Sequence, residues 1–183
     1  MAAPPKAVAY IEMEDFLALE NASKYKHEYL QGVIYAIQGE PARGMAGGSQ
    51  THSRIIRNAG YALHGKLQGS PCEALSTEMR LRVAAADAVF YPDVLVHCQQ
   101  IGNPATTMEL TEARLVIEVL SPTTQHFDCA DKLRAYQRPA GLQHIILLSS
   151  MEGWGDRFRR QAGLPVRNCA SLSLESQLLF LRQ

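Results

Sequence analysis

The sequence predicts an α/β fold, and three stretches in the second half of the chain support that prediction. Residues 115–120 and 144–149 are short, rich in β-branched side chains and almost continuously apolar, as is typical of strands covered on both faces. Residues 128–138 between them have the pattern of a helix, which Pro139 ends. A strand–helix–strand unit of this kind forms a right-handed crossover between parallel strands.

The first half of the chain adds further elements in order. We expect a short helix over 11–19, a strand pair or bent strand over 29–37, a glycine-rich loop over 39–49, a helix over 51–67, strands over 78–83 and 89–97 joined by a turn at 84–87, and a turn-rich connection over 102–107. An apolar residue at every fourth position supports the long helix, and Ser49 or Thr51 would cap it. Residues 172–181 fit either a strand or a closing helix.

Length and composition indicate one globular domain. The 183 residues are 46% hydrophobic and 20% charged, which is enough apolar material for a real core. No repeat or linker divides the chain, so we expect a single domain over 1–183 with residues 1–9 as a flexible lead-in. The 18 basic and 18 acidic residues give no net charge, which argues against strong non-specific binding of nucleic acid but allows a local basic patch.

The four cysteines, Cys72, Cys98, Cys129 and Cys169, show no C-x-x-C pair and no regular spacing. We interpret them as reduced thiols rather than as a disulfide frame or a zinc site. No apolar run reaches the roughly 18 residues that span a bilayer, and the N-terminal residues lack the apolar core of a signal peptide. We therefore expect a cytoplasmic protein with no membrane partner.

Two acidic residues, Asp93 and Glu118, lie within apolar runs, 118 − 93 = 25 positions apart. Burying a carboxylate costs several kcal/mol unless a cation, backbone N–H groups or a metal ion compensates it. If the two strands are neighbours, both side chains converge on one ion. Two carboxylates and a backbone carbonyl, assigned to Val119, suit Mg²⁺ or Mn²⁺. A salt bridge or a strand-end cap is the alternative for either acid alone.

Three basic residues are candidates for contact with a substrate phosphate. Lys132 follows Asp128 by four positions on the expected helix, so the pair is either a surface ion pair worth a few tenths of a kcal/mol or a means of placing the ammonium over the strand end. His52 stands at the start of the long helix, where it either caps and packs or contacts substrate. Arg43 in the glycine-rich loop is either solvated or bound to phosphate.

Taken together, these residues resemble the Uma-two family of restriction-endonuclease-like proteins within the PD-(D/E)XK nuclease superfamily. The matching segments are P-D at 92–93, V-I-E-V-L-S-P-T-T at 116–124, D-C-A-D-K-L-R-A-Y at 128–136 and E-Y-L-Q-G-V-I-Y at 28–35, together with His52. The resemblance extends over roughly residues 14–148.

The resemblance implies a restriction-endonuclease-like central mixed β-sheet flanked by helices, a divalent metal held by Asp93 and Glu118, and hydrolysis of phosphodiester bonds. Lys132 takes the place of the catalytic lysine, and Glu28 matches a further acid of the site. The superfamily more often has that lysine two residues after the strand acid, where this chain has Leu120. The implied substrate is nucleic acid, with DNA preferred, and the expected assembly is a homodimer.

Two functions from different classes remain open at this point. The first is a Mg²⁺-dependent endonuclease, with Mn²⁺ as a substitute ion. The second is a non-catalytic nuclease-fold module for binding or oligomerisation, in which Asp93 and Glu118 pair with Lys132 or Arg134 in an internal ion network. Carboxylates facing an open cleft would favour the enzyme, and a closed, fully paired cluster would favour the module.

Overall fold

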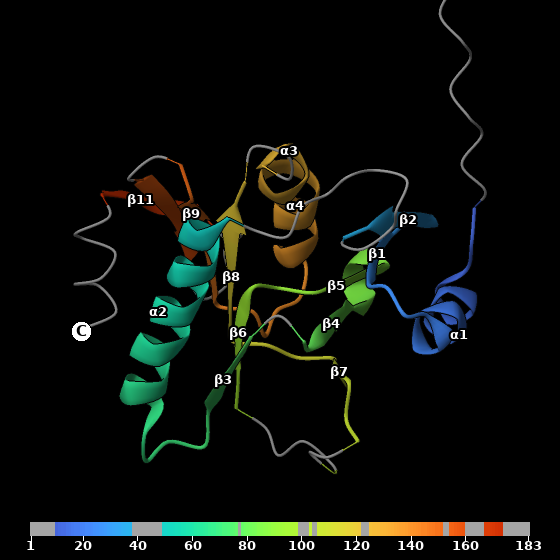
Figure 1. Ribbon diagram of the computed structural model, residues 1–183, viewed down its shortest axis with the longest axis horizontal. Coiled ribbons are helices and arrows are strands. Elements are labelled where there is room, and N and C mark those ends of the chain that lie inside the picture. Colours follow the sequence, from blue (N-terminus) through green and yellow to red (C-terminus); the bar gives the residue numbers. More distant parts are fainter. Residues whose placement is uncertain are drawn as a thin grey trace, which may run out of the picture.

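The computed structural model describes residues 10–37, 49–76, 78–98, 103, 106–121, 125–151, 154–159 and 167–173. Over these residues the chain forms two mixed β-sheets with helices packed against them (Figure 1). The expected α/β class is confirmed, with the strands divided between two sheets. The expectations for residues 1–9, for the loop that contains Arg43 and for residues beyond 173 lie outside the described residues.

The first sheet has five strands in the order β2 (Val33–Ala36), β1 (His27–Leu30), β5 (Ala88–Phe90), β4 (Arg80–Val83) and β7 (Glu109–Leu110). The second has six, in the order β11 (Arg167–Ser173), β10 (Trp154–Arg159), β9 (His144–Ser149), β8 (Leu115–Leu120), β6 (Val94–His97) and β3 (Glu73–Ser76). The helices are α1 (Met13–Ala22), α2 (Gln50–Leu67), α3 (Gln125–Phe127) and α4 (Leu133–Tyr136), with a 3-10 turn at Ala84–Ala86 and a π-helical turn at Asp128–Lys132.

The crossover predicted for the second half of the chain is present. Strands β8 and β9 are parallel, with Ile117 opposite Ile146, and the helical stretch from α3 to α4 connects them. Helices α2 and α4 lie on opposite sides of β8 (Figure 1). On the α2 side, Ile117 and Val119 pack with Leu63. Strand β8 is therefore covered on both faces, as its apolar sequence predicts.

The other face of β8 packs against the helix that follows it. Val116 and Leu120 join a core with Tyr136 of α4 and Phe90 of β5. This core fills the space between the two sheets. Because side chains alternate along a strand, Glu118 projects from β8 into the same layer, where it is 3% exposed.

The prediction of a single strand over 89–97 is wrong. The chain forms β5 in the first sheet, breaks at residues 91–93 and continues as β6 in the second sheet. Pro92 lies at the break, and proline has no N–H to donate to a strand ladder. The break carries the chain from one sheet to the other and leaves Asp93 directly before β6.

Most of the other expected elements are confirmed. Helix α1 matches the helix at 11–19, and β1 and β2 form the strand pair around a turn in which Gln31 and Gly32 have φ of 48° and 85°, as a tight hairpin requires. Ser49 caps α2, because its side chain accepts a hydrogen bond from the His52 N–H at 3.1 Å. Strands β3, β7 and β10 were not anticipated. The helix at 128–138 begins earlier, at Gln125, and contains the π-helical turn.

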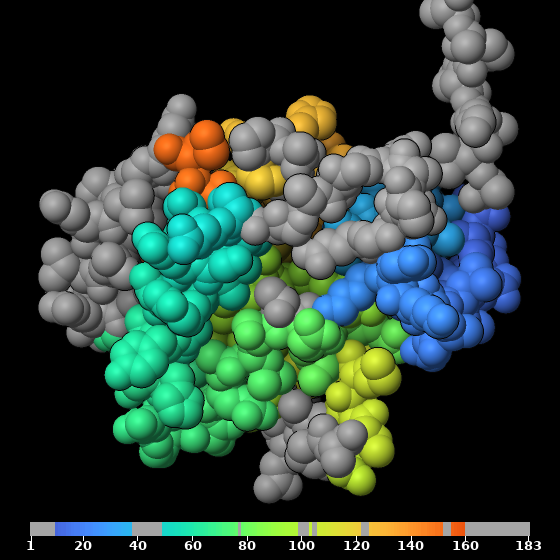
Figure 2. All heavy atoms as spheres, in the orientation of Figure 1, coloured from blue at the N-terminus to red at the C-terminus, as the bar shows by residue number. Residues whose placement is uncertain are grey.

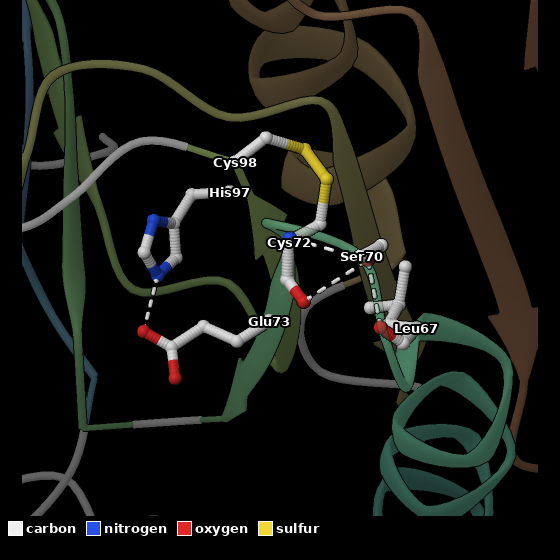
Figure 3. The surroundings of a disulfide bond; sticks show 6 residues. All are labelled: Leu67, Ser70, Cys72, Glu73, His97 and Cys98. Carbon is white, nitrogen blue, oxygen red and sulfur yellow. Dashed lines mark hydrogen bonds and ion pairs between the residues drawn. A yellow bond between two sulfur atoms is a disulfide. The ribbon is translucent and has the colours of Figure 1, made fainter.

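The interpretation of all cysteines as reduced thiols is wrong, because Cys72 and Cys98 form a disulfide. Figure 3 shows it at the edge of the second sheet, where Cys72 precedes β3 and Cys98 follows β6. Glu73 and His97 are paired across these strands, so the two cysteines form the next opposed pair. Cys129 is a free thiol. The cytoplasmic expectation therefore loses its support from the cysteines.

The helices in the described part of the chain fall short of what a bilayer crossing needs in length or in apolar character.

Candidate active site

A buried lysine lies at the centre of the candidate site, surrounded by three carboxylates. The Lys132 Nζ is 2.7 Å from Glu28 Oε1, 3.2 Å from Asp128 Oδ1 and 3.5 Å from Glu118 Oε1. The four side chains are at most 7% exposed. They come from β1, β8 and the π-helical turn, so the cluster joins both sheets to the crossover helix. We refer to these four residues as the Lys132 cluster.

Neighbouring groups close the Lys132 cluster on its other sides. The Tyr136 hydroxyl donates to Glu118 Oε1 at 2.7 Å, and the Tyr91 N–H donates to Glu28 Oε1 at 3.1 Å. The rings of Phe90 and Phe127 have centroids 5.7 and 5.8 Å from the Lys132 Nζ. Cation–π contacts of this kind gain strength when water is excluded. The cluster is thus a desolvated, hydrogen-bonded ion network.

Burial and the neighbouring charges shift the pKa values of these groups in opposite directions. Desolvation raises the pKa of Glu118 well above its ordinary value, and the Lys132 ammonium only partly offsets it. Burial raises the pKa of Glu28 in the same way. For Lys132, burial alone would lower the pKa, but the surrounding carboxylates raise it well above the usual lysine value. The lysine therefore stays protonated and acts as a fixed positive charge.

Asp93 lies beside this cluster, directly before the strand next to β8. Strand β6 runs antiparallel to β8 with Val94 opposite Ile117, and continuing this register by one pair places Asp93 opposite Glu118. Directly opposed residues share a face of the sheet, with Cβ atoms about 4.5–5.5 Å apart. Asp93 Oδ2 accepts a hydrogen bond from the Val119 N–H at 2.7 Å. The two acids singled out in the sequence are therefore neighbours.

The same register explains why the backbone at Val119 is available on this side. In an antiparallel pair the N–H and C=O of one residue point to the same partner strand, so the Val119 carbonyl faces β6 as its N–H does. The residue opposite Val119 is Pro92, by the register that pairs Val94 with Ile117, and Pro92 has no N–H. The ladder partner that would bond the Val119 carbonyl is absent.

His52 approaches the same oxygen of Asp93 that accepts the Val119 N–H. Its Nε2 is 3.6 Å from Asp93 Oδ2, and both side chains are 18% exposed. His52 reaches this position because Ser49 caps α2 and holds its first turn against the end of β6. Desolvation raises the pKa of Asp93, while the Val119 N–H and His52 lower it. Asp93 and His52 form the more accessible edge of the site.

The structure brings together most of the residues that the sequence indicates. Asp93, Glu118, Val119 and His52 meet at the ends of β6 and β8, and Glu28 and Lys132 lie directly behind them. Arg43 falls outside the described residues. Two residues of the site were not among the predicted site residues: Asp128, which the sequence suggests only as the partner of Lys132 in an ion pair, and Tyr136. Their spacing from Lys132, four positions on either side, is the sequence signal that links them to it.

The donor set fits a divalent cation in chemistry and in charge. Four carboxylates, from Glu28, Asp93, Glu118 and Asp128, face one lysine and one histidine. Among the residues that the structure describes, no three His, Cys, Asp or Glu side chains are arranged to hold a metal ion. The arrangement expected here uses two carboxylates and a backbone carbonyl, and Mg²⁺ commonly takes few protein ligands and keeps several waters. The excess of buried negative charge is what such an ion would balance.

Comparisons with known proteins identify relatives over most of the chain. The model of the Uma2 family, described as "Putative restriction endonuclease", matches residues 13–179. Two uncharacterized proteins of Synechocystis sp. are 34% identical over 137 residues and 30% identical over 135 residues. These alignments cover 75% and 73% of this chain, and 67% and 72% of the relatives.

One solved structure is similar in fold. It is a crystal structure from Anabaena variabilis described as "a putative nuclease belonging to DUF820", with a TM-score of 0.68 and 18% sequence identity. The alignment covers 93% of this chain and 99% of that one. At this identity the likeness concerns the fold, and it extends over both sheets and their helices.

Proposed function

Because the chain belongs to the Uma2 family of restriction-endonuclease-like proteins, we propose that it is a divalent-metal-dependent nuclease that hydrolyses phosphodiester bonds in DNA. One observation carries the proposal beyond the family. Asp93, directly before β6, comes opposite Glu118 of β8 when the register of the two strands is continued by one pair, beside a Val119 carbonyl that Pro92 cannot bond. Two carboxylates and one carbonyl at a strand end form an oxygen donor set of the kind that Mg²⁺ prefers.

In this proposal Asp93, Glu118 and the Val119 carbonyl hold Mg²⁺, and Mn²⁺ can substitute for it. When bound, the ion supplies a Lewis acid that stabilises negative charge on the phosphoryl oxygens. Tyr136 and Lys132 both contact Oε1 of Glu118. These contacts hold the carboxylate by one oxygen, and in this proposal the other oxygen, Oε2, would bind the ion.

Lys132 acts electrostatically rather than as an acid or a base. Its raised pKa keeps it charged, and its ammonium offsets the repulsion among the carboxylates around it. A fixed positive charge behind the metal ligands also stabilises the negative charge that develops on the phosphate in the transition state. Glu28 holds the ammonium in place through its contact of 2.7 Å.

His52 contacts the substrate in this proposal. It lies at the more accessible edge of the site, next to Asp93, where an imidazole N–H can donate to a phosphate oxygen. We also propose that the protein acts as a two-fold dimer, because two sites related by a two-fold axis suit the cleavage of both strands of a duplex. Light scattering on the purified chain tests the assembly.

Cleavage of supercoiled plasmid DNA, measured with Mg²⁺, with Mn²⁺ and with EDTA, tests the proposal. Asp93→Asn is the most informative variant, because the amide oxygen still accepts the Val119 N–H while the charge is lost. Glu118→Gln keeps an acceptor for Tyr136 in the same way. Asp131→Asn is the matched control, since Asp131 is a partly exposed acid that pairs with Arg134 outside the site.

We expect metal-dependent cleavage by the wild type and by Asp131→Asn, and none by the two site variants. Titration calorimetry with Mn²⁺ should show uptake that Asp93→Asn abolishes. Circular dichroism confirms that each variant is folded. Cleavage that persists in Glu118→Gln would refute the assignment of the metal site.

The closed Lys132 cluster favours a second candidate, the non-catalytic module. Its one ammonium contacts all three carboxylates at 2.7 to 3.5 Å, as expected of an internal ion network. The module has no use for an ion between Asp93 and Glu118. Failure of the folded wild type to take up Mn²⁺ at millimolar concentration, together with no cleavage of any nucleic acid, would establish this candidate over the nuclease.

A further inference from the structure

Helix α2 presents a basic and aromatic stripe to solvent. Arg54, Arg57, Tyr61 and His64 are all exposed, and Tyr61 is 81% exposed. Their spacing of three, four and three residues places them within about 80° of the helix circumference, at 3.6 residues per turn. The buried residues of the helix, Ala59 and Leu63, lie on the opposite face. We call these four exposed residues the α2 stripe.

Helix α2 carries basic residues and no acidic ones. The helix contains Arg54, Arg57 and Lys66 and no acidic residue in 18 positions, although the whole chain has equal numbers of basic and acidic residues. Figure 2 shows the helix, in turquoise to green, at the surface on the left of the view. A single element thus carries a local excess of positive charge.

Some surface cations in the described part of the chain have an acidic partner, whereas the arginines of α2 have none there. Lys26, Arg82 and Arg134 pair with Glu78, Glu14 and Asp131 at 2.8, 2.8 and 3.4 Å. Within the part of the chain that the structure describes, neither Arg54 nor Arg57 forms an ion pair. Their charge is therefore available to an external anion.

The stripe begins next to the candidate active site. His52, in the first turn of α2, reaches Asp93, and Arg54 is two residues further along the helix on its outer side. From Arg54 to His64 the axis extends about 15 Å at 1.5 Å per residue. A linear polyanion lying along α2 from His64 to Arg54 would therefore reach the turn of the helix that carries His52.

We infer that the α2 stripe binds the phosphate backbone of duplex DNA and delivers it to the site. The inference rests on the nuclease function proposed above and adds the surface on which the substrate lies. Arginine forms charge-assisted bonds with phosphate, and contacts of this type position a duplex without reading its sequence. Single strands are usually held by several stacked aromatic side chains, whereas the stripe offers one, Tyr61. The α2 stripe therefore suits a DNA duplex better than a single strand.

The salt dependence of binding measures these contacts directly. We would measure fluorescence anisotropy of a labelled duplex of about 20 base pairs with the full chain in EDTA, so that cleavage does not interfere. Each phosphate contact contributes about 0.9 to the slope of log K against log[salt]. Arg54→Gln/Arg57→Gln removes two contacts and should reduce the slope by about 1.8. Between 50 and 200 mM salt the wild type should then lose about 12-fold more affinity than the variant.

The matched control removes the same charge at the other end of the molecule. Lys24→Gln/Arg82→Gln changes a residue just after α1 and one that pairs with Glu14 of α1, and α1 and α2 lie at opposite ends of the long axis (Figure 1). We expect this control to keep the wild-type slope. A labelled single strand and a labelled RNA duplex serve as further probes.

The outcomes separate this inference from the nuclease proposal. An unchanged slope in Arg54→Gln/Arg57→Gln, with firm binding by the wild type, would overturn the role of α2 and leave the nuclease proposal standing. Tighter binding of a single strand or of RNA that depends on the same arginines would overturn the assignment to duplex DNA. No binding of any nucleic acid by the wild type would overturn both.

Discussion

Replacing Lys132 by methionine tests the central electrostatic feature of the fold. The substitution keeps much of the length and volume of the side chain and removes its charge. Glu28, Asp128 and Glu118 then lose the ammonium that lies 2.7 to 3.5 Å from them. Three carboxylates would remain in a layer where they are at most 6% exposed.

The expected cost is large. Removing one partner of a buried ion pair typically destabilises a protein by about 3–5 kcal/mol, because a buried charge is left without compensation. For a domain of this size, 1 kcal/mol shifts the melting temperature by about 2–4 °C. We therefore expect Lys132→Met to lower the melting temperature by about 6–20 °C at neutral pH.

Urea unfolding followed by circular dichroism gives the free energy of unfolding of each variant. Arg134→Met is the matched control, two positions along the same helix, where the side chain is 77% exposed and lies 3.4 Å from Asp131. An exposed pair of this kind is worth about 0–1 kcal/mol. The difference between the two variants isolates the effect of burial from the loss of a positive charge.

The cost of Lys132→Met should also depend on pH. Burial raises the pKa of Glu28 and of Glu118 above the ordinary value for glutamate, and losing Lys132 raises both further. A carboxyl group whose pKa is raised by folding favours the folded state at low pH and loses that contribution as pH rises through the folded-state pKa. The variant should therefore be closer to the wild type at pH 5 than at pH 8. A loss below 1 kcal/mol, or one that is equal at both pH values, would refute the reasoning.

Three further predictions concern single contacts. Tyr136→Phe removes the hydroxyl that donates to Glu118 Oε1 and should lower the free energy of unfolding by about 1.5–3 kcal/mol, the usual worth of a hydrogen bond to a charged group; a neutral result in urea would mean that Lys132 alone satisfies the carboxylate. Reduction of the Cys72–Cys98 disulfide, which joins residues 26 positions apart, should cost about 3–4 kcal/mol by the loop-closure relation, and equal calorimetric melting points with and without reductant would contradict it. Ser49→Ala removes the cap of α2 and should cost about 1 kcal/mol, measured by urea unfolding against Ser53→Ala as an exposed control on the same helix.

Local patterns in the sequence were sufficient to predict the crossover from β8 to β9. The apolar run at 115–120 is typical of a strand covered on both faces, and the helix and strand after it follow from periodicity and from Pro139. The same runs single out Asp93 and Glu118, because a carboxylate among β-branched residues needs compensation. Continuing the register of β6 with β8 by one pair brings these two acids opposite each other, and Asp93 acts electrostatically on Glu118.

The sequence did not predict features that depend on packing between distant segments. Asp128 and Lys132 have the spacing of a surface pair, and only the contact of their helix with both sheets buries them. The disulfide depends on the register of β3 with β6, which the positions of Cys72 and Cys98 in the sequence do not reveal. The change of sheet at Pro92 was missed because the residues on either side of it are equally apolar.

The Lys132 cluster has a consequence for how the molecule opens. Glu28 belongs to the first sheet and Glu118 to the second, and one ammonium contacts both. Neither sheet can separate from the other without exposing unbalanced charges in a layer that excludes water. Local unfolding of one sheet therefore destabilises the other. The two sheets should form one cooperative unit in native-state hydrogen exchange. Amides of β1 and of β8 should then exchange with the same free energy of opening.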